Sequence, residues 1–427
     1  MDSIDIKREV FACIDRGAGS VVEVVKDIGA HPELGFREFR TSDVVNDFLR
    51  TAGYETERGL AVTGIKAKLK KETGSPNIAF LAELDGIPCS GKAVAHYCGH
   101  NLQLGVMMAV AQAFKQSGIA SLLGGNISFL ATPAEEFIEL EYRSELRQQG
   151  LIRYFGGKQE LVRIGAFDDV DAALMVHSQG YTPFPFAGTV SACNGLMADM
   201  IRYIGKSAHA AMPDEGINAL HAAVLGLNAV NALRETFRDE DRNRVHYIIT
   251  KGGDAVNSVP ADVRLECFVR SSTVKSMLQL LYKTEQAFRA GGEALGAGID
   301  IKRRAGYLPL ICNQMINRIF ADNARPFIPA NNVVTVNFFK ASTDMGDISH
   351  LIPAIHPFIG GVDGALHAET FRLVDIAAAI FTPAKIVAAT FIDLLENDAA
   401  KMRSIKENSL PLLAKTEYLE LLDSLIT

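Results

Sequence analysis

Three short apolar runs, at residues 78–82, 126–131 and 171–176, each end beside acidic or histidine side chains. Apolar runs of this length are typical of buried strands, and the spacing at 103–117 predicts a helix between two of them. Strands that alternate with helices predict an α/β domain, in which the carboxyl ends of the strands meet at one sheet edge, where active sites form. The side chains expected at that edge are Glu83, Asp85, Glu135, Glu136 and His177.

The middle of the chain has a different pattern. Residues 191–305 predict a strand, a helix, two strands, a second helix and a last strand, an order typical of a ferredoxin-like α+β sheet with helices on one face. A chain of 427 residues is too long for one ordinary core. We therefore expect a catalytic domain in two parts, 1–190 and 306–427, with residues 191–305 inserted as a lid or dimerisation domain.

Composition narrows the class of protein. The net charge is −7 and no basic block occurs, which argues against a nucleic-acid partner. Residues 1–7 contain no apolar signal region. The apolar segment 376–394 is interrupted by Pro383 and contains Lys385, so it predicts a buried helix and no membrane span. Six cysteines without a disulfide-like spacing indicate a reduced, cytoplasmic protein.

One stretch adds a thiol and an imidazole to the carboxylates. Cys98-Gly99-His100 lies directly before the predicted helix, and His367 is isolated near the end of the chain. Each motif alone has an ordinary explanation, such as a core histidine or, for Glu135-Glu136, an acidic helix N-terminus. Together they supply several deprotonatable ligands and one spare carboxylate, which is what a divalent-metal hydrolase needs.

These residues, with other short motifs, resemble the M20 metallopeptidases and amidohydrolases, in particular the branch of aminobenzoyl-glutamate and N-acyl-amino-acid hydrolases. The resemblance covers nearly the whole chain. The motifs that carry it lie at residues 31–35, 82–88, 98–101, 133–136, 205–210, 252–260, 342–347 and 367. The family implies a metal-dependent catalytic domain interrupted by a smaller lid and dimerisation domain, and hence a homodimer or larger homo-oligomer.

The resemblance also implies roles for single residues. Glu135 matches the general acid/base. Asp85 would orient one of the metal ligands without binding the ion itself. The implied metal ligands are Cys98, His100, Glu136, His177 and His367. On the inserted domain, His209 and Asn257 would contact the substrate, and Arg270 would lie near a substrate carboxylate. The implied cofactor is one or two divalent ions, zinc if the thiol and histidines dominate or manganese if the carboxylates do.

The chain departs from the family in residues 137–155, which separate Glu136 from Gly156-Gly157-Lys158. This segment carries Tyr142, Arg143, Arg147, Arg153 and Tyr154. We expect it to narrow the pocket to a flat, anionic aromatic substrate, with Arg143, Arg147 or Arg153 binding the anion in bidentate fashion. The ordinary alternative is that these arginines lie on the exposed face of a helix and do not bind substrate.

The longer segment is similar to that of an aromatic aminohydrolase of the family. The expected function is therefore hydrolysis of a C–N bond in a small anionic substrate, with deamination of an aromatic amine such as 5-nitroanthranilate to 5-nitrosalicylate and ammonia preferred. Activated water would attack the ring carbon, and Glu135 would protonate the departing nitrogen. The alternative is an amidohydrolase of N-acyl or aminobenzoyl amino acids. A non-catalytic binding protein on the same fold is a second alternative.

Overall fold

The computed structural model describes residues 3–70, 74–90 and 93–426, so the first two residues of the N-terminal segment lie outside it. The chain forms two compact units. Unit 1 comprises Met1–Ala192, Ile311–Phe339 and Asp347–Lys415; unit 2 comprises Cys193–Leu310, Lys340–Gly346 and Thr416–Thr427. Unit 2 thus extends beyond the predicted segment 191–305 and includes two short pieces from the last third of the chain.

A six-stranded sheet forms the centre of unit 1. Its strands, in spatial order, are β1 (Thr56–Leu60), β2 (Gly64–Lys68), β6 (Asn126–Thr132), β3 (Asn77–Glu83), β7 (Ala172–Met175) and β15 (Ala354–Ile355). β3 pairs in parallel with β6 and β7, and β7 pairs in parallel with β15. Every residue of β3 and β6 is buried, as expected of parallel strands covered on both faces. The predicted α/β class is confirmed.

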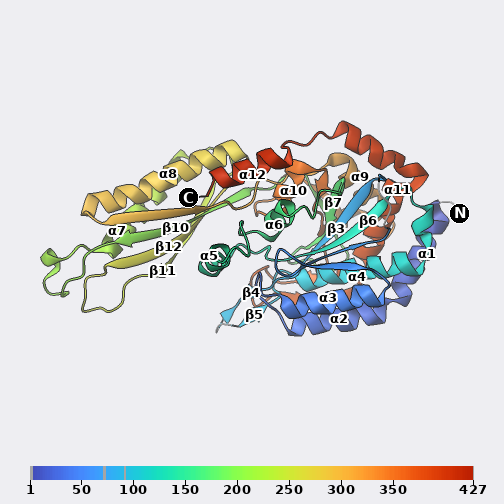
Figure 1. The fold of residues 1–427 in the computed structure, drawn as a ribbon, viewed down its shortest axis with the longest axis horizontal. Helices are drawn as coiled ribbons and strands as arrows, with labels where there is room; N and C mark the ends of the chain where they lie inside the picture. Colours follow the sequence, from blue (N-terminus) through green and yellow to red (C-terminus); the bar gives the residue numbers. More distant parts are fainter. Residues whose placement is uncertain (1–2, 71–73, 91–92, 427) are drawn as a thin grey trace. The chain divides into compact units, whose positions relative to one another are not determined.

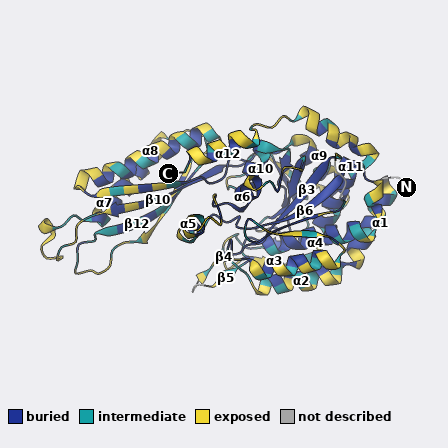
Figure 2. Ribbon diagram, in the orientation of Figure 1, coloured by how far each residue is buried: buried dark blue, intermediate teal, exposed yellow. Residues whose placement is uncertain are grey.

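Unit 1 also contains helices. They are α1 (Ser3–Arg16), α2 (Ala18–Ala30), α3 (Phe39–Thr51), α4 (His100–Gln116), α5 (Leu140–Gln148), α6 (Gly157–Arg163), α9 (Gln314–Ala324), α10 (Met345–Leu351) and α11 (Thr382–Asn408). α2, α3 and α4 lie together on one side of β3 and β6 in Figure 1. α4 is almost entirely buried, whereas α2 and α3 keep exposed outer faces, drawn yellow in Figure 2. The core of unit 1 therefore runs through the sheet and α4.

Smaller strands complete unit 1. A four-stranded sheet has the order β14 (Val333–Val336), β9 (Ala187–Val190), β16 (Phe358–Ile359) and β8 (His177–Ser178). Two short hairpins add β4 (Ile87–Pro88) with β5 (Val94–Ala95), and β17 (Val362–Asp363) with β18 (Arg372–Leu373). β7 and β8 are separated only by Val176, so the end of β7 delivers His177 directly into the second sheet.

α11 is the one helix, among the described residues, that is long and apolar enough to cross a membrane, taken together with the turn before it as Ala377–Asn408. The apolar window of this segment is 78% buried inside the protein. Phe391 of α11 packs edge-on against Phe80 of β3, with ring centroids 6.3 Å apart. Backbone angles at Glu396, Asn397, Asp398 and Ala399 are non-helical, so the helix is also interrupted. These features are those of a core helix.

Unit 2 is built on a four-stranded antiparallel sheet. Its strands are β10 (Gly195–Ile204), β11 (Arg244–Lys251), β12 (Asp262–Ser271) and β13 (Gly298–Arg304), in the spatial order β11-β12-β10-β13. The helices are α7 (Ala219–Leu233) and α8 (Val274–Leu295), which pack against each other and on the sheet, with α12 (Lys415–Ser424) at the end of the chain. The predicted β-α-β-β-α-β order and the ferredoxin-like architecture are confirmed.

Asp199 of β10 is a buried acid in this sheet. It is fully buried, and neither carboxylate oxygen makes a hydrogen bond within the described residues. Burial and the nearby charge of Glu285 raise the pKa of Asp199 to about 8, against the opposing effects of Arg303 and Arg289. Asp199 is therefore neutral in the folded protein near pH 7, because an ionised, unpaired carboxylate would be too costly to bury.

This acid makes stability depend on pH. Between about pH 4 and pH 8 the folded state holds a proton on residue 199 that the unfolded chain releases, so stability should fall as pH rises through that window. Asp199→Asn removes the titration, and we expect the variant to gain on the order of a few kcal/mol over the wild type between pH 5 and pH 8. Urea unfolding of both proteins at several pH values measures this difference. A difference that does not change with pH would contradict the assignment.

Candidate metal centre

The parallel register of unit 1 brings the predicted site residues together. Glu83, the last residue of β3, lies opposite Thr132, the last residue of β6. Asp85 follows β3, Glu135 and Glu136 follow β6, and His177 follows β7. All of these side chains are buried. The edge predicted from the sequence is therefore where the polar residues collect.

Cys98 lies at the centre of the cluster. Its Sγ is 3.3 Å from His177 Nε2 and 3.2 Å from His367 Nε2. His367 Nε2 is also 3.1 Å from Glu136 Oε1. Two groups of possible ligand atoms, each within 4.8 Å, share Cys98: one contains His100 and His177, and the other contains Glu136 and His367. The five predicted ligands thus converge as two neighbouring groups with a common thiol.

The backbone places these ligands closely. Gly99 is the N-cap of α4 and has φ +81°, which favours glycine, and a Cβ there would lie 2.4 Å from Ser178 Oγ. Only glycine fits between Cys98 and His100. His367 also has a positive φ of 61°, and its N–H donates to Tyr97 O at 2.9 Å. This bond ties the distant His367 loop to the residue before Cys98.

Asp85 orients two of the ligands. Its Oδ1 is 3.1 Å from His100 Nδ1, and its Oδ2 accepts a hydrogen bond of 2.9 Å from Glu136 N. His100 Nδ1 is also 2.8 Å from Asp85 O. These contacts leave His100 Nε2 as the nitrogen available to an ion, which is how carboxylates fix metal-binding imidazoles in general.

A buried ion pair lies beside His100. Lys158 Nζ is 2.8 Å from Glu83 Oε1, and both side chains have no exposed surface. Glu83 Oε2 accepts from Gln103 Nε2 at 3.0 Å and is 3.1 Å from His100 Nε2. Burial opposes ionisation of Glu83, but Lys158 and His100 outweigh it and hold the pKa of Glu83 far below its usual range. The sequence pointed to Glu83, but gave no sign that Lys158 neutralises it.

Glu135 has the position of a spare carboxylate. It is 8% exposed and lies with Glu83 and His100 in a third group of atoms within 4.8 Å. It belongs to neither of the two groups that share Cys98. A carboxylate beside the ligands and outside their groups can move a proton at the site.

The donor set fits a divalent ion. His100 Nε2 and Glu136 Oε1 are buried and make no hydrogen bond within the described part of the chain, although each lies 3.1 Å from an ionisable neighbour. Burial and the charge of Glu136 raise the pKa of the Cys98 thiol well above its usual value. A cation among these atoms reverses that preference, since thiolate, imidazole and carboxylate are all metal ligands. The two groups around Cys98 could hold one ion each.

The segment 137–155 supports the centre through Arg143. This side chain is fully buried in α5, Nη1 donates to Phe155 O at 2.5 Å, and Nη2 donates to Glu136 O. The prediction that Arg143 binds a substrate anion does not fit this position, because its guanidinium is committed to backbone carbonyls. Arg147 is half-buried and Arg153 is exposed, and their proposed contact with substrate stays a prediction.

Three predicted substrate contacts lie on unit 2. His209 and Asn257 are exposed on neighbouring loops, joined by a bridge between His209 and Ser258 and by the bond from Ala210 N to Asn257 O at 3.0 Å. Arg270 is half-buried on β12, with its Cζ 5.4 Å from the centre of the Phe268 ring. The shared loop location suits a joint role for His209 and Asn257, and all three assignments stay predictions.

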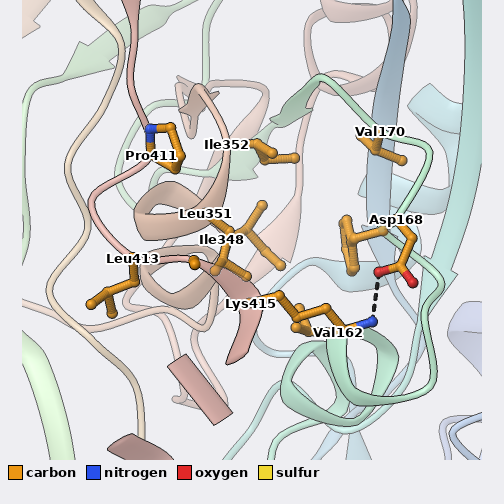
Figure 3. A pocket seen from close by; sticks show the side chains of 11 residues that line it. Val162, Asp168, Val170, Ile348, Leu351, Ile352, Pro411, Leu413 and Lys415 are labelled. Atoms are coloured by element: carbon orange, nitrogen blue, oxygen red, sulfur yellow. Dashed lines mark hydrogen bonds and ion pairs between the residues drawn. The ribbon is translucent and has the colours of Figure 1, made fainter. Parts of the chain in front are cut away.

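Another cavity of unit 1 is lined by none of the predicted metal ligands. It has a volume of about 330 Å³ and an apolar wall that includes Ile348 and Leu351 of α10. Figure 3 shows this wall and the ion pair between Lys415 and Asp168, 2.6 Å long, at its edge. None of the residues that line the cavity belongs to the ligand cluster. The cluster around Cys98 is therefore the candidate site of chemistry.

Known proteins match this chain over most of its length. Residues 193–294, within unit 2, match the model of the peptidase dimerisation domain. The chain is 30% identical to the Xaa-Arg dipeptidase of Mus musculus, over 91% of this chain and 89% of that protein. It is 25% identical to one of the subunits of the p-aminobenzoyl-glutamate hydrolase of Escherichia coli (strain K12), over 91% of this chain and 92% of that protein.

A solved structure agrees in fold. The crystal structure of a dinuclear metal-binding peptidase of the M20 family from Bacillus subtilis matches with a TM-score of 0.65 and 17% identity, over 90% of this chain and 99% of that one. The fold of this chain is that of the M20 hydrolases. With the dipeptidase relative, this fold shows that the chain belongs to the M20 family of peptidases and amidohydrolases.

The ligand assignment predicts a division between two kinds of variant. We expect metal binding to weaken by more than ~100-fold in each of His100→Ala, Glu136→Ala and His367→Ala. Mutation of residues that only orient a metal ligand already lowers metal affinity 10- to 100-fold. Glu135→Ala should keep its metal. Metal analysis of the purified proteins tests this, with the exposed His246→Ala as a matched control. Full metal content in His100→Ala would rule out the centre as described.

The buried ion pair predicts a second effect. Lys158→Met leaves the Glu83 carboxylate buried without its lysine partner, so the metal-free protein should lose about 3–5 kcal/mol of stability. Adding Glu83→Gln to this variant should restore most of the loss. Lys401→Met, which breaks a surface pair with Glu396, should change stability by less than ~1 kcal/mol. Urea unfolding measures all three, and an equal loss in the single and double variants would contradict the pairing.

Proposed function

We propose that the protein is a metal-dependent amidohydrolase that cleaves the amide bond of a small N-acyl amino acid or dipeptide. The observation that carries the proposal is the convergence of five ligand side chains around Cys98, with Glu135 beside them and outside their groups. The relatives support amide cleavage, since one is named a dipeptidase and another a hydrolase of p-aminobenzoyl-glutamate.

The residues of the metal centre have different proposed roles. Cys98, His100, His177, Glu136 and His367 would hold one or two ions. A divalent ion bound there supplies Lewis acidity, which polarises a carbonyl and makes water a better nucleophile at neutral pH. Asp85 keeps His100 and the Glu136 backbone in place through its two oxygens. These contacts pre-organise the ligands before substrate arrives.

Glu135 would move the proton. It takes a proton from the attacking water as the new carbon–oxygen bond forms. It then gives that proton to the amide nitrogen as the carbon–nitrogen bond breaks, leaving a carboxylate and an amine. A buried carboxylate with 8% exposure is suited to this, because little water competes for the proton. His209 and Asn257 of unit 2 are the proposed substrate contacts.

Deamination of an aromatic amine, the preferred expectation from the sequence, is less well supported. That expectation rested on segment 137–155 and on its arginines as anion ligands. Arg143 instead holds backbone carbonyls in the interior. The comparisons include relatives that cleave amides and give no support for 5-nitroanthranilate as substrate. The amidohydrolase alternative therefore becomes the proposed function.

A substrate panel separates the two reactions. We expect the metal-loaded enzyme to release amine from at least one of N-acetyl amino acids, Xaa-Arg dipeptides and p-aminobenzoyl-glutamate, and no ammonia from 5-nitroanthranilate. Glu135→Gln should lower kcat by at least about 100-fold while bound metal stays constant. Ammonia release from 5-nitroanthranilate without cleavage of any amide would overturn the proposal and return the assignment to the aminohydrolase.

A further inference from the structure

Glu38 is a buried carboxyl of unit 1 outside the metal centre. It is the N-cap of α3, a position at which a side-chain oxygen often accepts a hydrogen bond from the first turn of the helix. The side chain of Glu38 makes no such bond. Glu33 accepts bonds from that turn instead, from Arg40 N at 3.1 Å and from Thr41 N at 2.7 Å. The carboxyl of Glu38, which has no exposed surface, is therefore directed to other partners.

One of these partners is the loop after β6. Glu38 Oε1 accepts a hydrogen bond of 2.8 Å from Ala134 N, and Oε2 accepts one of 2.7 Å from Thr63 Oγ1. Ala134 is the residue before Glu135, and it lies 96 positions beyond Glu38 in the chain. The turn before Glu38 packs closely against the same loop, because a Cβ on Gly35 would lie 2.9 Å from Ala134 Cβ. The start of α3 is thus in direct contact with the residue that precedes the spare carboxylate.

Ala134 has a backbone conformation that needs such support. Its φ is +50°, in the left-handed region that is unfavourable for a residue with a Cβ. A conformation of this kind persists only where the surrounding contacts fix it. Glu38 accepts from the N–H of Ala134, and Gly157 N donates to its carbonyl at 3.3 Å. Both polar groups of residue 134 are bonded, so the direction in which the chain enters Glu135 depends on these two contacts.

Glu136, on the other side of Glu135, has separate supports. Its N–H donates to Asp85 Oδ2, and its carbonyl accepts from Arg143. Loss of the Glu38 contact would therefore loosen the chain before Glu135, while Glu136 keeps both of its own bonds. The contact of Glu38 thus bears on the carboxylate that would move the proton more than on the neighbouring one that would hold the metal.

We propose that Glu38 is a positioning residue for proton transfer, which acts through Ala134 to aim the Glu135 carboxylate at the reacting atoms. This inference rests on the proposed function, in which Glu135 carries the proton from water to the amide nitrogen. A general acid/base must lie within hydrogen-bond reach of the proton that it moves. A small displacement of Glu135 therefore slows the chemical step, even when substrate and metal still bind.

The reach of the Glu38 side chain matters here more than its charge. Burial and the nearby charge of Asp85 raise the pKa of Glu38 to about 7, against the opposing hydrogen bonds from Thr63 and the backbone. The neutral carboxyl is therefore well populated near neutral pH. A glutamine has the same length, is neutral, and has a side-chain oxygen that can accept the bond from Ala134 N. An aspartate keeps the charge but is one methylene shorter.

Steady-state kinetics of the metal-loaded protein, on an amide that the wild type cleaves, test the role. Glu38→Ala should lower kcat by roughly 10- to 100-fold, with KM and bound metal unchanged. Glu38→Gln should keep most of the wild-type kcat, whereas Glu38→Asp should lose as much as Glu38→Ala. Glu33→Ala is the matched control, because Glu33 also accepts from two backbone N–H groups but only within α3, and it should keep kcat.

Hydrogen exchange of residues 133–137, read by mass spectrometry, needs no substrate. We expect faster exchange in Glu38→Ala and Glu38→Asp than in the wild type and Glu38→Gln. Faster exchange in these variants of a protein that cleaves no amide would overturn the proposed function and still support the hold of Glu38 on the loop.

Three results would overturn the positioning role. They are an unchanged kcat in folded Glu38→Ala, a higher kcat in Glu38→Asp than in Glu38→Gln, and an equal loss of kcat in Glu33→Ala. The comparison of Glu38→Gln with Glu38→Asp decides the question even where Glu38→Ala does not fold.

Discussion

The two oxygens of Asp85 form the contact on which the centre of unit 1 depends. One oxygen holds the His100 ring and the other holds the Glu136 backbone. Asp85 follows β3 and Glu136 follows β6, so this carboxylate joins the ends of two neighbouring parallel strands. A ligand from α4 and a ligand from a loop are thereby fixed to one rigid sheet edge. The positions of Cys98 and His177 around them follow from the same edge.

Two buried cations surround this centre and do different things. Lys158 neutralises Glu83, whose other oxygen is 3.1 Å from His100 Nε2, so a further carboxylate can lie beside the ligands at low electrostatic cost. Arg143 instead supports the main chain, because it donates to the carbonyl of Glu136. The extra segment 137–155 thus stiffens the loop that carries Glu135 and Glu136. We interpret its length as support for the ligands, which weakens its link to substrate choice.

Unit 2 has two features of its own, a buried acid and an exposed edge strand. Its sheet buries an acid, Asp199, that stays neutral because nothing nearby pairs with it well enough. Its edge strand β11 exposes Ile248 and Ile249, as expected of a strand that can pair with another chain. Homodimerisation through this unit stays a prediction, to which the match with the peptidase dimerisation domain lends support.

The sequence by itself determined the elements and the ligand types. Apolar runs fixed β3, β6 and β7, and the residues that end those runs had to meet because parallel strands share an edge. Only the tertiary structure decided that Lys158 pairs with Glu83 and that Arg143 donates to the carbonyl of Glu136. The first of these pairs spans 75 residues of chain. Local periodicity indicates which face of an element is buried, whereas such contacts depend on which distant element covers that face.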